Sequence, residues 1–146
     1  MFKHILITTD GSAVANKAAK AAIALAHALR AKVTAYCAIE ELQPIIVEGY
    51  AFDQKTIEGI EEGALKVAQK RVDAIGKMAK AAGVPFNSVV TKAYTPYEGI
   101  INAARKQKCD SVFMASHGRR GLSKLMMGSV TQQVLMHSKI PVVVYR

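Results

Sequence analysis

The stretch FMASHGRRGLSKLMMGSVT, residues 113–131, holds the residue types best suited to bind an anion. It contains three glycines, the adjacent pair Arg119 and Arg120, and a Gly-Ser step at Gly128 that opens a predicted helix. Glycine lets a backbone turn close to a ligand, while the start of a helix presents unpaired N–H groups and the positive end of its dipole. The pattern therefore indicates a phosphate-binding loop directly after an apolar, strand-like segment.

The glycine spacing differs from that of two well-known phosphate loops. A P-loop needs GxxxxGK followed by Ser or Thr, and a dinucleotide fingerprint needs GxGxxG directly after the first strand. This chain has TTDGS after its first predicted strand instead. On residue types alone, a phosphate cradle and a merely flexible, basic loop stay open as alternatives.

Composition describes one globular domain, expected to span residues 1–146. The chain has 146 residues, of which 51% are hydrophobic and 21% charged, enough to bury a core without disulfides or metal. Cys37 and Cys109 are too isolated for a disulfide framework or a zinc site, so packing is their expected role. No apolar run approaches the roughly 20 residues that cross a bilayer. The opening MFKHILITTDGS predicts a strand rather than a signal peptide, and the cytoplasm is the expected location.

The net charge of +9 is unevenly distributed along the chain. Residues 1–90 carry 11 Lys/Arg against 9 Asp/Glu, whereas residues 91–146 carry 9 against 2. Such an excess makes nucleic acid, anionic lipid and phosphorylated ligands conceivable partners. Neither an aromatic platform nor a recognition motif accompanies the charge, so nucleic acid ranks last among them.

Hydrophobic periodicity and turn residues predict an alternation of strands and helices. Strands are expected at residues 4–9, 32–39, 86–93, 109–116 and 140–146, and helices at 13–30, 56–82, 95–108 and 127–137. Ser12 and Thr95 are expected caps, and Gly83 ends the second helix. The residues at 40–53 have no consistent period and indicate a long connection or lid.

This alternation predicts a single-domain α/β fold, Rossmann-like, with an open parallel five-stranded sheet and helices on both faces. In such sheets a ligand lies outside the carboxyl ends of the strands, where the strand order reverses. That rule points to Thr9 and Asp10 in the TTDGS segment. The apolar run IPVVVY at the chain end is expected at a sheet edge, where unpaired backbone groups invite another chain.

The segment MASHGRRGLSKLMMGSVT resembles the nucleotide-binding signature of the universal stress protein family. ATP-binding members carry Gly, two residues, Gly, nine residues, Gly, then Ser or Thr. Here Gly118, the nine residues 119–127, Gly128 and Ser129 match, while Ala115 replaces the first glycine. That replacement matters if the backbone there needs a positive φ or presses against the ligand. The resemblance covers essentially the whole chain and implies a fold like that of the adenine nucleotide α-hydrolases.

The resemblance also implies which residues would hold ATP. Asp10 would pair with adenine or ribose beside Thr9, and Ala38 would line the adenine pocket. The residues expected along the ribose and phosphates are Met114, Ala115, His117, Gly118, Arg119, Gly128, Ser129, Val130 and Thr131. Mg or Mn is expected to accompany the triphosphate. The sequence shows no cluster of protein carboxylates that would hold the ion otherwise. No catalytic residue and no separate metal site are expected.

The resemblance implies a cytoplasmic stress-response protein that binds ATP as a sensor or regulator, with at most slow hydrolysis, and a homodimer joined through its last strand. The alternative is a nucleotide-independent homodimeric interaction module of the same fold. An enzyme that attacks the α-phosphate would need an SGGxDS loop or HIGH and KMSKS-like motifs, which this sequence lacks. Single residues also have plainer explanations: Asp10 as a helix cap with Ser12, His117 as a loop residue bonded to backbone, and Arg119 and Arg120 as solvated charges.

Overall fold

A computed structural model of the chain describes residues 2–41, 46–47, 50–51, 53–118 and 127–146. In chain order its elements are β1 (His4–Thr8), α1 (Ala13–Leu29), β2 (Lys32–Glu40), β3 (Ile46–Val47), β4 (Tyr50–Ala51), α2 (Gln54–Ala81), β5 (Phe86–Ala93), α3 (Pro96–Lys106), β6 (Ser111–Ala115), α4 (Ser129–His137) and β7 (Val142–Tyr145). The strand and helix order expected from the sequence is confirmed. The structure adds the short strands β3 and β4 within residues 40–53, for which the sequence indicated only a long connection or lid.

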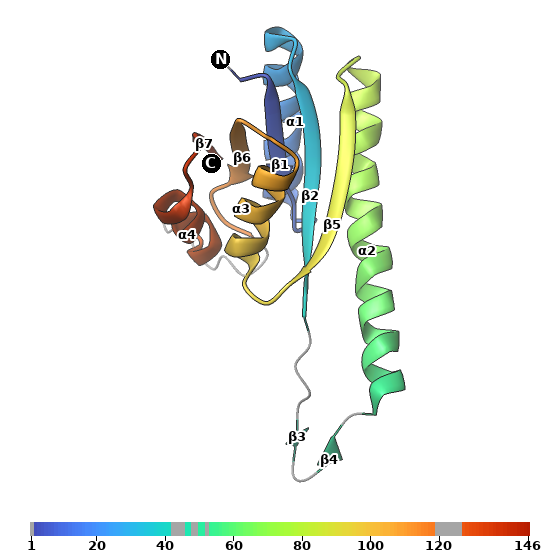
Figure 1. Cartoon of the computed structure of the whole chain (residues 1–146). Coiled ribbons are helices and arrows are strands. Elements are labelled where there is room, and N and C mark those ends of the chain that lie inside the picture. The colour runs from blue at the N-terminus through green and yellow to red at the C-terminus, as the bar shows by residue number, and fades with distance from the viewer. Residues whose placement is uncertain (1, 42–45, 48–49, 52, 119–126) are drawn as a thin grey trace.

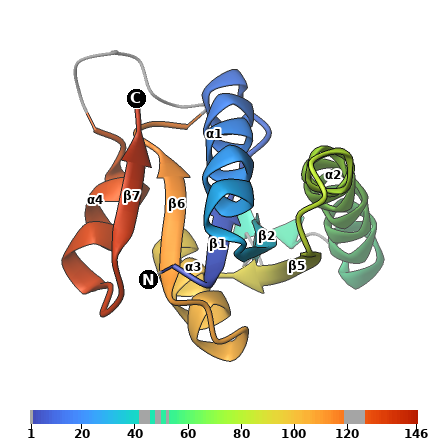
Figure 2. The same cartoon turned by 90° about the horizontal axis from the view of Figure 1, so that it is seen from above.

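Five strands form one parallel sheet in the order β5-β2-β1-β6-β7. Helices α1 and α2 cover one face and α3 and α4 the other (Figure 2). The predicted α/β fold with helices on both faces is therefore confirmed. β1 is central and all five of its residues are buried, which matches the continuous apolar run that a doubly covered strand requires.

Each face of the sheet has its own hydrophobic core. Beneath α1 and α2, the small side chains of Ala18, Ala19 and Ala22 let the first helix approach the sheet closely. Beneath α3 and α4, Tyr36 and Val134 are fully buried. These two cores hold the strand ends in fixed positions, and the loops at those ends inherit that rigidity.

Three helix boundaries differ from the sequence prediction by two residues, and one of them is the end of α3, at Lys106 rather than residue 108. The second long helix begins at Gln54 rather than residue 56, because the Asp53 carboxylate accepts the Thr56 N–H at 2.7 Å and caps it earlier. The last helix begins at Ser129 rather than residue 127. The predicted cap Ser12 is confirmed, whereas the Thr95 hydroxyl bonds to Glu98 instead of the helix backbone.

The two ends of the sheet have different shapes. β2 and β5 end in register, at Glu40 and Ala93, and extend past the carboxyl ends of β1, β6 and β7. The β3–β4 pair lies beyond them, next to the first turn of α2 (Figure 1). The predicted edge position of the last strand is confirmed, since β7 closes one side of the sheet and β5 the other. Among the described residues, no helix is long and apolar enough to cross a membrane.

Candidate functional site

The strand order reverses at β1, which lies between β2 and β6. The chain moves outward from β1 through β2 to β5, and then crosses back to β6 on the opposite side of β1. Crevices of this kind open where neighbouring connections leave in opposite directions. The reversal point expected beside TTDGS is confirmed, and the segments that follow β1 and β6 meet there.

The loop after β1 is a tight, hydrogen-bonded turn. The Thr9 N–H donates to the Tyr36 carbonyl at 3.0 Å, and the Thr9 hydroxyl accepts the Gly11 N–H at 3.0 Å. The Asp10 Oδ1 accepts the Ser12 N–H at 2.9 Å, while the Ser12 hydroxyl caps α1 through the Ala15 N–H at 3.1 Å. Asp10 thus shapes the turn and Ser12 alone supplies the helix cap. The carboxylate of Asp10 is held in place before any ligand arrives.

Gly11 is favoured at its position by its backbone conformation, and it leaves space for a neighbouring arginine. Its φ is +80°, a conformation that side chains disfavour, and a Cβ there would lie 2.5 Å from the Arg71 Nε. Arg71, from α2, therefore lies directly against the loop that carries Asp10. Sequence reasoning missed this residue. The available signal was a cation next to Ala68 and Val72, the buried stripe of α2.

Gly118 brings the segment after β6 up to the loop after β1. A Cβ on Gly118 would lie 2.5 Å from the Asp10 Oδ2. Gly128 makes a second close approach, because a Cβ there would lie 3.3 Å from the His117 Cα, and its N–H donates to the Ser116 carbonyl at 2.8 Å. Both signature glycines therefore stand at close approaches. A Cβ on Gly118 would fit only if Asp10 moved, whereas a Cβ on Gly128 would need a smaller shift of its neighbour.

Ala115, which replaces the first signature glycine, needs no special backbone conformation. It ends β6 in register with Tyr145, and its φ is not positive. Its carbonyl accepts the buried Thr131 hydroxyl at 3.0 Å, which ties α4 to the strand end. The Thr131 hydroxyl, expected to donate to phosphate, therefore donates to this carbonyl.

The start of α4 lies next to Ser116, which directly follows β6, because the Gly128 N–H donates to the Ser116 carbonyl. Gly128 occupies the N-cap position, and no side chain caps the helix. The first N–H groups of a helix have no partners within it, so those of Ser129, Val130 and Thr131 are the donors this helix offers. Ser129 is exposed, whereas the Val130 side chain packs against the core beneath α3 and α4. Val130 can therefore offer a ligand its backbone but not its side chain.

The remaining predicted site residues divide into three groups. Met114 is a buried member of the core beneath α3 and α4, and Ala38 packs against that same core from β2. His117 bonds through Nδ1 to the Ser116 hydroxyl at 3.0 Å, a side chain rather than the backbone partner expected. Arg119 lies outside the described residues, as does Arg120. Among the described residues, no three His, Cys, Asp or Glu side chains gather as a metal site.

Two hollows lie along β5, and neither is lined by Gly11, Gly118 or Gly128. One of about 220 Å³ separates β5 from α3, with Thr91 and Asn102 in its wall. Another of about 300 Å³ lies between β5 and α2, beside Leu65. Neither is lined by a residue predicted to bind nucleotide, so their volumes carry no argument about the glycine loops.

The sequence matches the description Universal stress protein family over residues 1–146. The chain belongs to the universal stress protein family. Universal stress protein MJ0531 of Methanocaldococcus jannaschii is 31% identical over 149 residues, which cover 100% of this chain and 83% of that protein. The solved structure of protein MJ0577 superposes with a TM-score of 0.84 at 26% identity, over 99% of this chain and 95% of that one.

Two further solved structures of universal stress proteins contain adenine nucleotides. One, in complex with cAMP, has a TM-score of 0.73 at 20% identity and covers 99% of this chain and 97% of that one. The other, from Archaeoglobus fulgidus in complex with dAMP, has a TM-score of 0.59 at 16% identity and covers 100% and 98%. At these identities the likeness to this chain is one of fold.

Proposed function

We propose that this universal stress protein binds ATP at the carboxyl edge of its sheet and acts as a sensor or regulator rather than as a fast enzyme. The observation that carries the proposal is the approach of Gly118 to the Asp10 carboxylate, at a distance that leaves no room for a Cβ. It brings an acceptor for adenine or ribose next to the segment that leads to α4. The cAMP and dAMP complexes of two fold relatives support the same class of ligand.

Each part of the proposed site has a physical role. Asp10 accepts hydrogen bonds from the nucleoside, and Ala38, two residues past the β2 partner of Thr8, lines the adenine side. The backbone N–H groups at the start of α4 face the phosphates, where the helix dipole favours negative charge. Mg or Mn enters with the triphosphate, whose oxygens hold it.

Hydrolysis is at most slow in this proposal. General-base catalysis needs a side chain placed to take a proton from water, and in the described site His117 is the residue nearest that role. Its Nδ1 is engaged by the Ser116 hydroxyl at 3.0 Å. The site therefore suits retention of nucleotide better than its turnover, and ATP occupancy can act as the signal.

A homodimer joined through β7 is the second part of the proposal. β7 is an edge strand of half-buried residues, Val142–Tyr145, whose outer backbone groups face away from β6. A second copy added along this strand would satisfy those groups. Sedimentation at micromolar concentration should show a dimer, and deletion of residues 141–146 should abolish it.

Isothermal calorimetry and mass spectrometry of released small molecules test the nucleotide. The purified chain should release or bind ATP, and Gly128→Val or Asp10→Ala should weaken binding roughly 10- to 150-fold, the worth of a charge-assisted hydrogen bond. If tight binding survives Gly128→Val, the cradle lies elsewhere. If neither ATP nor another adenine nucleotide binds while the dimer persists, the alternative of a nucleotide-independent interaction module replaces the proposal.

A further inference from the structure

The amino ends of the strands, opposite the proposed nucleotide site, form a surface that we call the amino edge. In a parallel sheet every loop that enters a strand lies at this end, so residues far apart in the sequence meet there. Basic residues stand in the loop or the last helical turn before every one of the five strands, and Lys32 is the first residue of β2. They are Lys3, Arg30, Lys32, Lys80, Arg105, Lys106, Lys108 and Lys139, all of them exposed.

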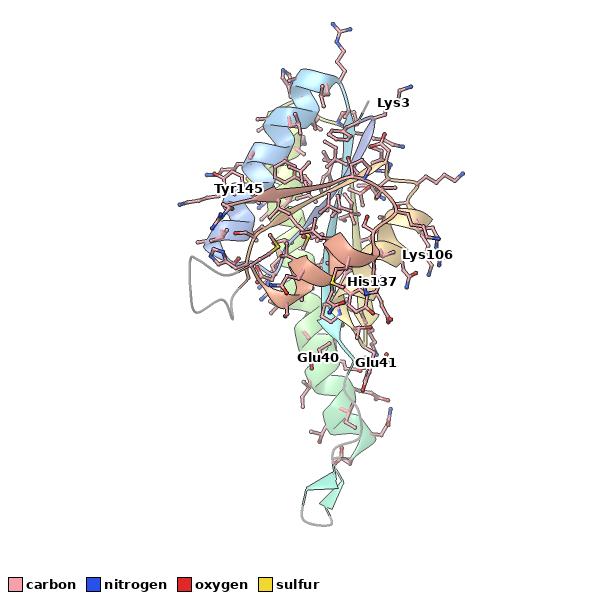
Figure 3. All side chains as sticks on the ribbon, turned by 90° about the vertical axis from the view of Figure 1, so that its left-hand side faces the viewer. Lys3, Glu40, Glu41, Lys106, His137 and Tyr145 are labelled. Carbon is pink, nitrogen blue, oxygen red and sulfur yellow. The ribbon has the colours of Figure 1, made fainter. Side chains whose placement is uncertain are left out.

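Acidic residues are concentrated at the other end. Glu40, Glu41, Asp53, Glu58, Glu61, Glu62 and Glu98 lie at the carboxyl edge or on the extension of α2 beyond it. In Figure 3, Lys3 lies toward one end of the molecule and Glu40 and Glu41 toward the other, with Lys106 between them. At the described part of the amino edge the acidic side chain is Asp110, which already accepts the Lys3 and His4 N–H groups.

The amino-edge cations are not neutralised by neighbours. Among the residues that the structure describes, ion pairs join only Lys66 to Glu62 and Lys92 to Glu61, neither at this edge. Helix carboxyl ends contribute about half a negative charge each. Four such ends offset only a small part of eight cations. Dipole stabilisation therefore accounts for single residues such as Lys80, but not for the excess of the whole edge.

Backbone strain supplies an independent observation. Arg30 and Lys108 are the non-glycine residues with positive φ in the described chain, at 53° and 54°. Both occupy the left-handed position after a helix that glycine favours, and Gly83 takes the equivalent place after α2 with φ 67°. A side chain there costs about 1 kcal/mol relative to glycine. The sequence thus holds charge at two positions of this edge at the expense of stability.

The arrangement of the charge favours one kind of partner. Neighbouring strands lie about 4.8 Å apart, so the five loops form a row of cations roughly 19 Å long. The large exposed apolar side chains in these last helical turns are Leu29 of α1 and Leu135 and Met136 of α4. They come from helices on opposite faces of the sheet, so they do not form one apolar surface that could insert into lipid or anchor a peptide.

The exposed rings in these last helical turns are the imidazoles of His27 and His137, and His137 already stacks on Tyr97. No exposed Phe or Tyr ring stands among the described residues of the edge, so bases lack an extended platform for stacking. The phosphates of a duplex can bind to cations without an apolar surface and without a stacking platform.

We propose that the amino edge binds the phosphate backbone of double-stranded nucleic acid without reading its sequence. The sequence ranked such a partner last because its cations are scattered among loops and match no motif. The fold gathers them in one row. The proposal does not depend on ATP binding, since none of these residues belongs to the nucleotide site.

Fluorescence anisotropy with a labelled 20-base-pair DNA duplex of arbitrary sequence tests the proposal. The logarithm of the binding constant should fall with the logarithm of salt concentration, by about 0.9 for each phosphate contact. The variant Arg30→Gln, Lys32→Gln, Lys106→Gln, Lys108→Gln should reduce that slope by about 3 to 4 and weaken binding at least tenfold at about 0.1 M salt.

A matched control removes the same charge elsewhere. Lys17→Gln, Lys20→Gln, Lys66→Gln, Lys70→Gln changes four exposed residues on the outer faces of α1 and α2. This variant should keep the slope and most of the affinity. Circular dichroism checks the fold of both, and calorimetry with ATP should give the same result for both.

Three outcomes would overturn the proposal. Equal weakening by the two quadruple variants would mean that net charge alone attracts DNA. No duplex binding at low salt would remove the surface as a nucleic-acid site. Binding of polyglutamate or phosphatidylserine vesicles, but not of duplex, through the same residues would assign the edge to an acidic protein or a membrane. ATP binding is measured separately by calorimetry in every case. A negative result with duplex would therefore not affect the nucleotide proposal.

Discussion

The carboxyl and amino edges of the same sheet use glycine in opposite ways. At the carboxyl edge, a Cβ on Gly11 or Gly118 would lie 2.5 Å from the Arg71 Nε or the Asp10 Oδ2, and a Cβ on Gly128 would lie 3.3 Å from the His117 Cα. At the amino edge, Gly83 has nothing within 4 Å of its missing Cβ, and two comparable turns carry Arg30 and Lys108 instead. Close approach of neighbouring atoms is a constraint at the carboxyl edge, in addition to the positive φ of Gly11, whereas backbone conformation alone is the constraint at the amino edge.

This difference shows how a parallel α/β sheet can separate two tasks. Where loops must converge on a ligand, side chains are removed so that backbones meet. Where loops only return the chain to the next strand, a strained but charged residue is tolerated, because nothing occupies the space around it. The following substitutions test this contrast, from the largest expected effect to the smallest.

Gly118→Val should have the largest effect, on ligand affinity. Its side chain would push against the Asp10 Oδ2 and separate the two loops. We expect ATP affinity to fall about 10- to 150-fold in calorimetry, since at least one charge-assisted hydrogen bond is lost. The amino-edge control Gly83→Ala should lower the thermal midpoint, because φ there is +67°, but leave ATP affinity unchanged. Equal affinity losses in both variants would erase the contrast between the edges.

Gly99→Ala should have the next largest effect, on stability. Gly99 lies in the first turns of α3, where a Cβ would collide with the Tyr36 hydroxyl and lie 2.9 Å from the Ala93 Cβ. Overpacking of this kind costs about 1 to 3 kcal/mol, measured by urea unfolding. The matched variant Gly63→Ala meets nothing within 4 Å in α2 and should gain about 0.5 to 1 kcal/mol. An unchanged free energy of unfolding for Gly99→Ala would show that Tyr36 and Ala93 can shift to accommodate the added methyl group.

Arg30→Gly and Lys108→Gly should each raise the free energy of unfolding by up to about 1 kcal/mol, because glycine relieves the left-handed strain. The same variants should weaken duplex binding, so stability and binding move in opposite directions. Lys106→Ala is the control: it removes a charge from the last turn of α3 without relieving any strain. It should weaken duplex binding without a comparable gain in stability. A loss of stability in the glycine variants would contradict the strain argument.

The smallest effect should come from His4, which is buried at the amino edge with its Nε2 2.8 Å from the Thr34 Oγ1. Burial lowers the pKa of His4, and Lys32 acts in the same direction. The unfolded chain therefore binds a proton at a higher pH than the folded one does. Stability should decline as pH falls from about 7 to 5, and urea unfolding should show a smaller decline for His4→Gln. If stability declined with falling pH equally in His4→Gln, titratable groups other than His4 would be responsible for the decline.

Much of the fold followed from local patterns. The apolar run before Asp10 predicted a strand because β1 is covered on both faces, and the Ser12 cap and the alanine-rich stripe predicted α1 to within a residue. Helix ends were less accurate where a side chain outside the periodic run acts as cap, as Asp53 does for α2. Periodicity describes what a helix buries, whereas its first residue depends on one hydrogen bond.

The candidate site was predicted unevenly for a similar reason. Gly118 and Gly128 were singled out because their spacing is a local property, and a Cβ on either would lie close to Asp10 or His117. That they hold a nucleotide stays a prediction. Met114 carries its side chain into the core, and the Thr131 hydroxyl bonds to the strand end. Arg71 was missed altogether. The direction of a side chain depends on packing between elements, which spacing along one segment does not encode.

The sequence by itself determined the order of strands and helices, the family, and the signature spacing of Gly118 and Gly128, because periodicity, turn chemistry and spacing are properties of neighbouring residues. Tertiary structure alone decided that Arg71 reaches Gly11, and that eight cations from five separate loops share one edge. Parallel strands place every entering loop at one end of the sheet and every leaving loop at the other. Charges dispersed along the chain therefore become a surface only after the strands have paired.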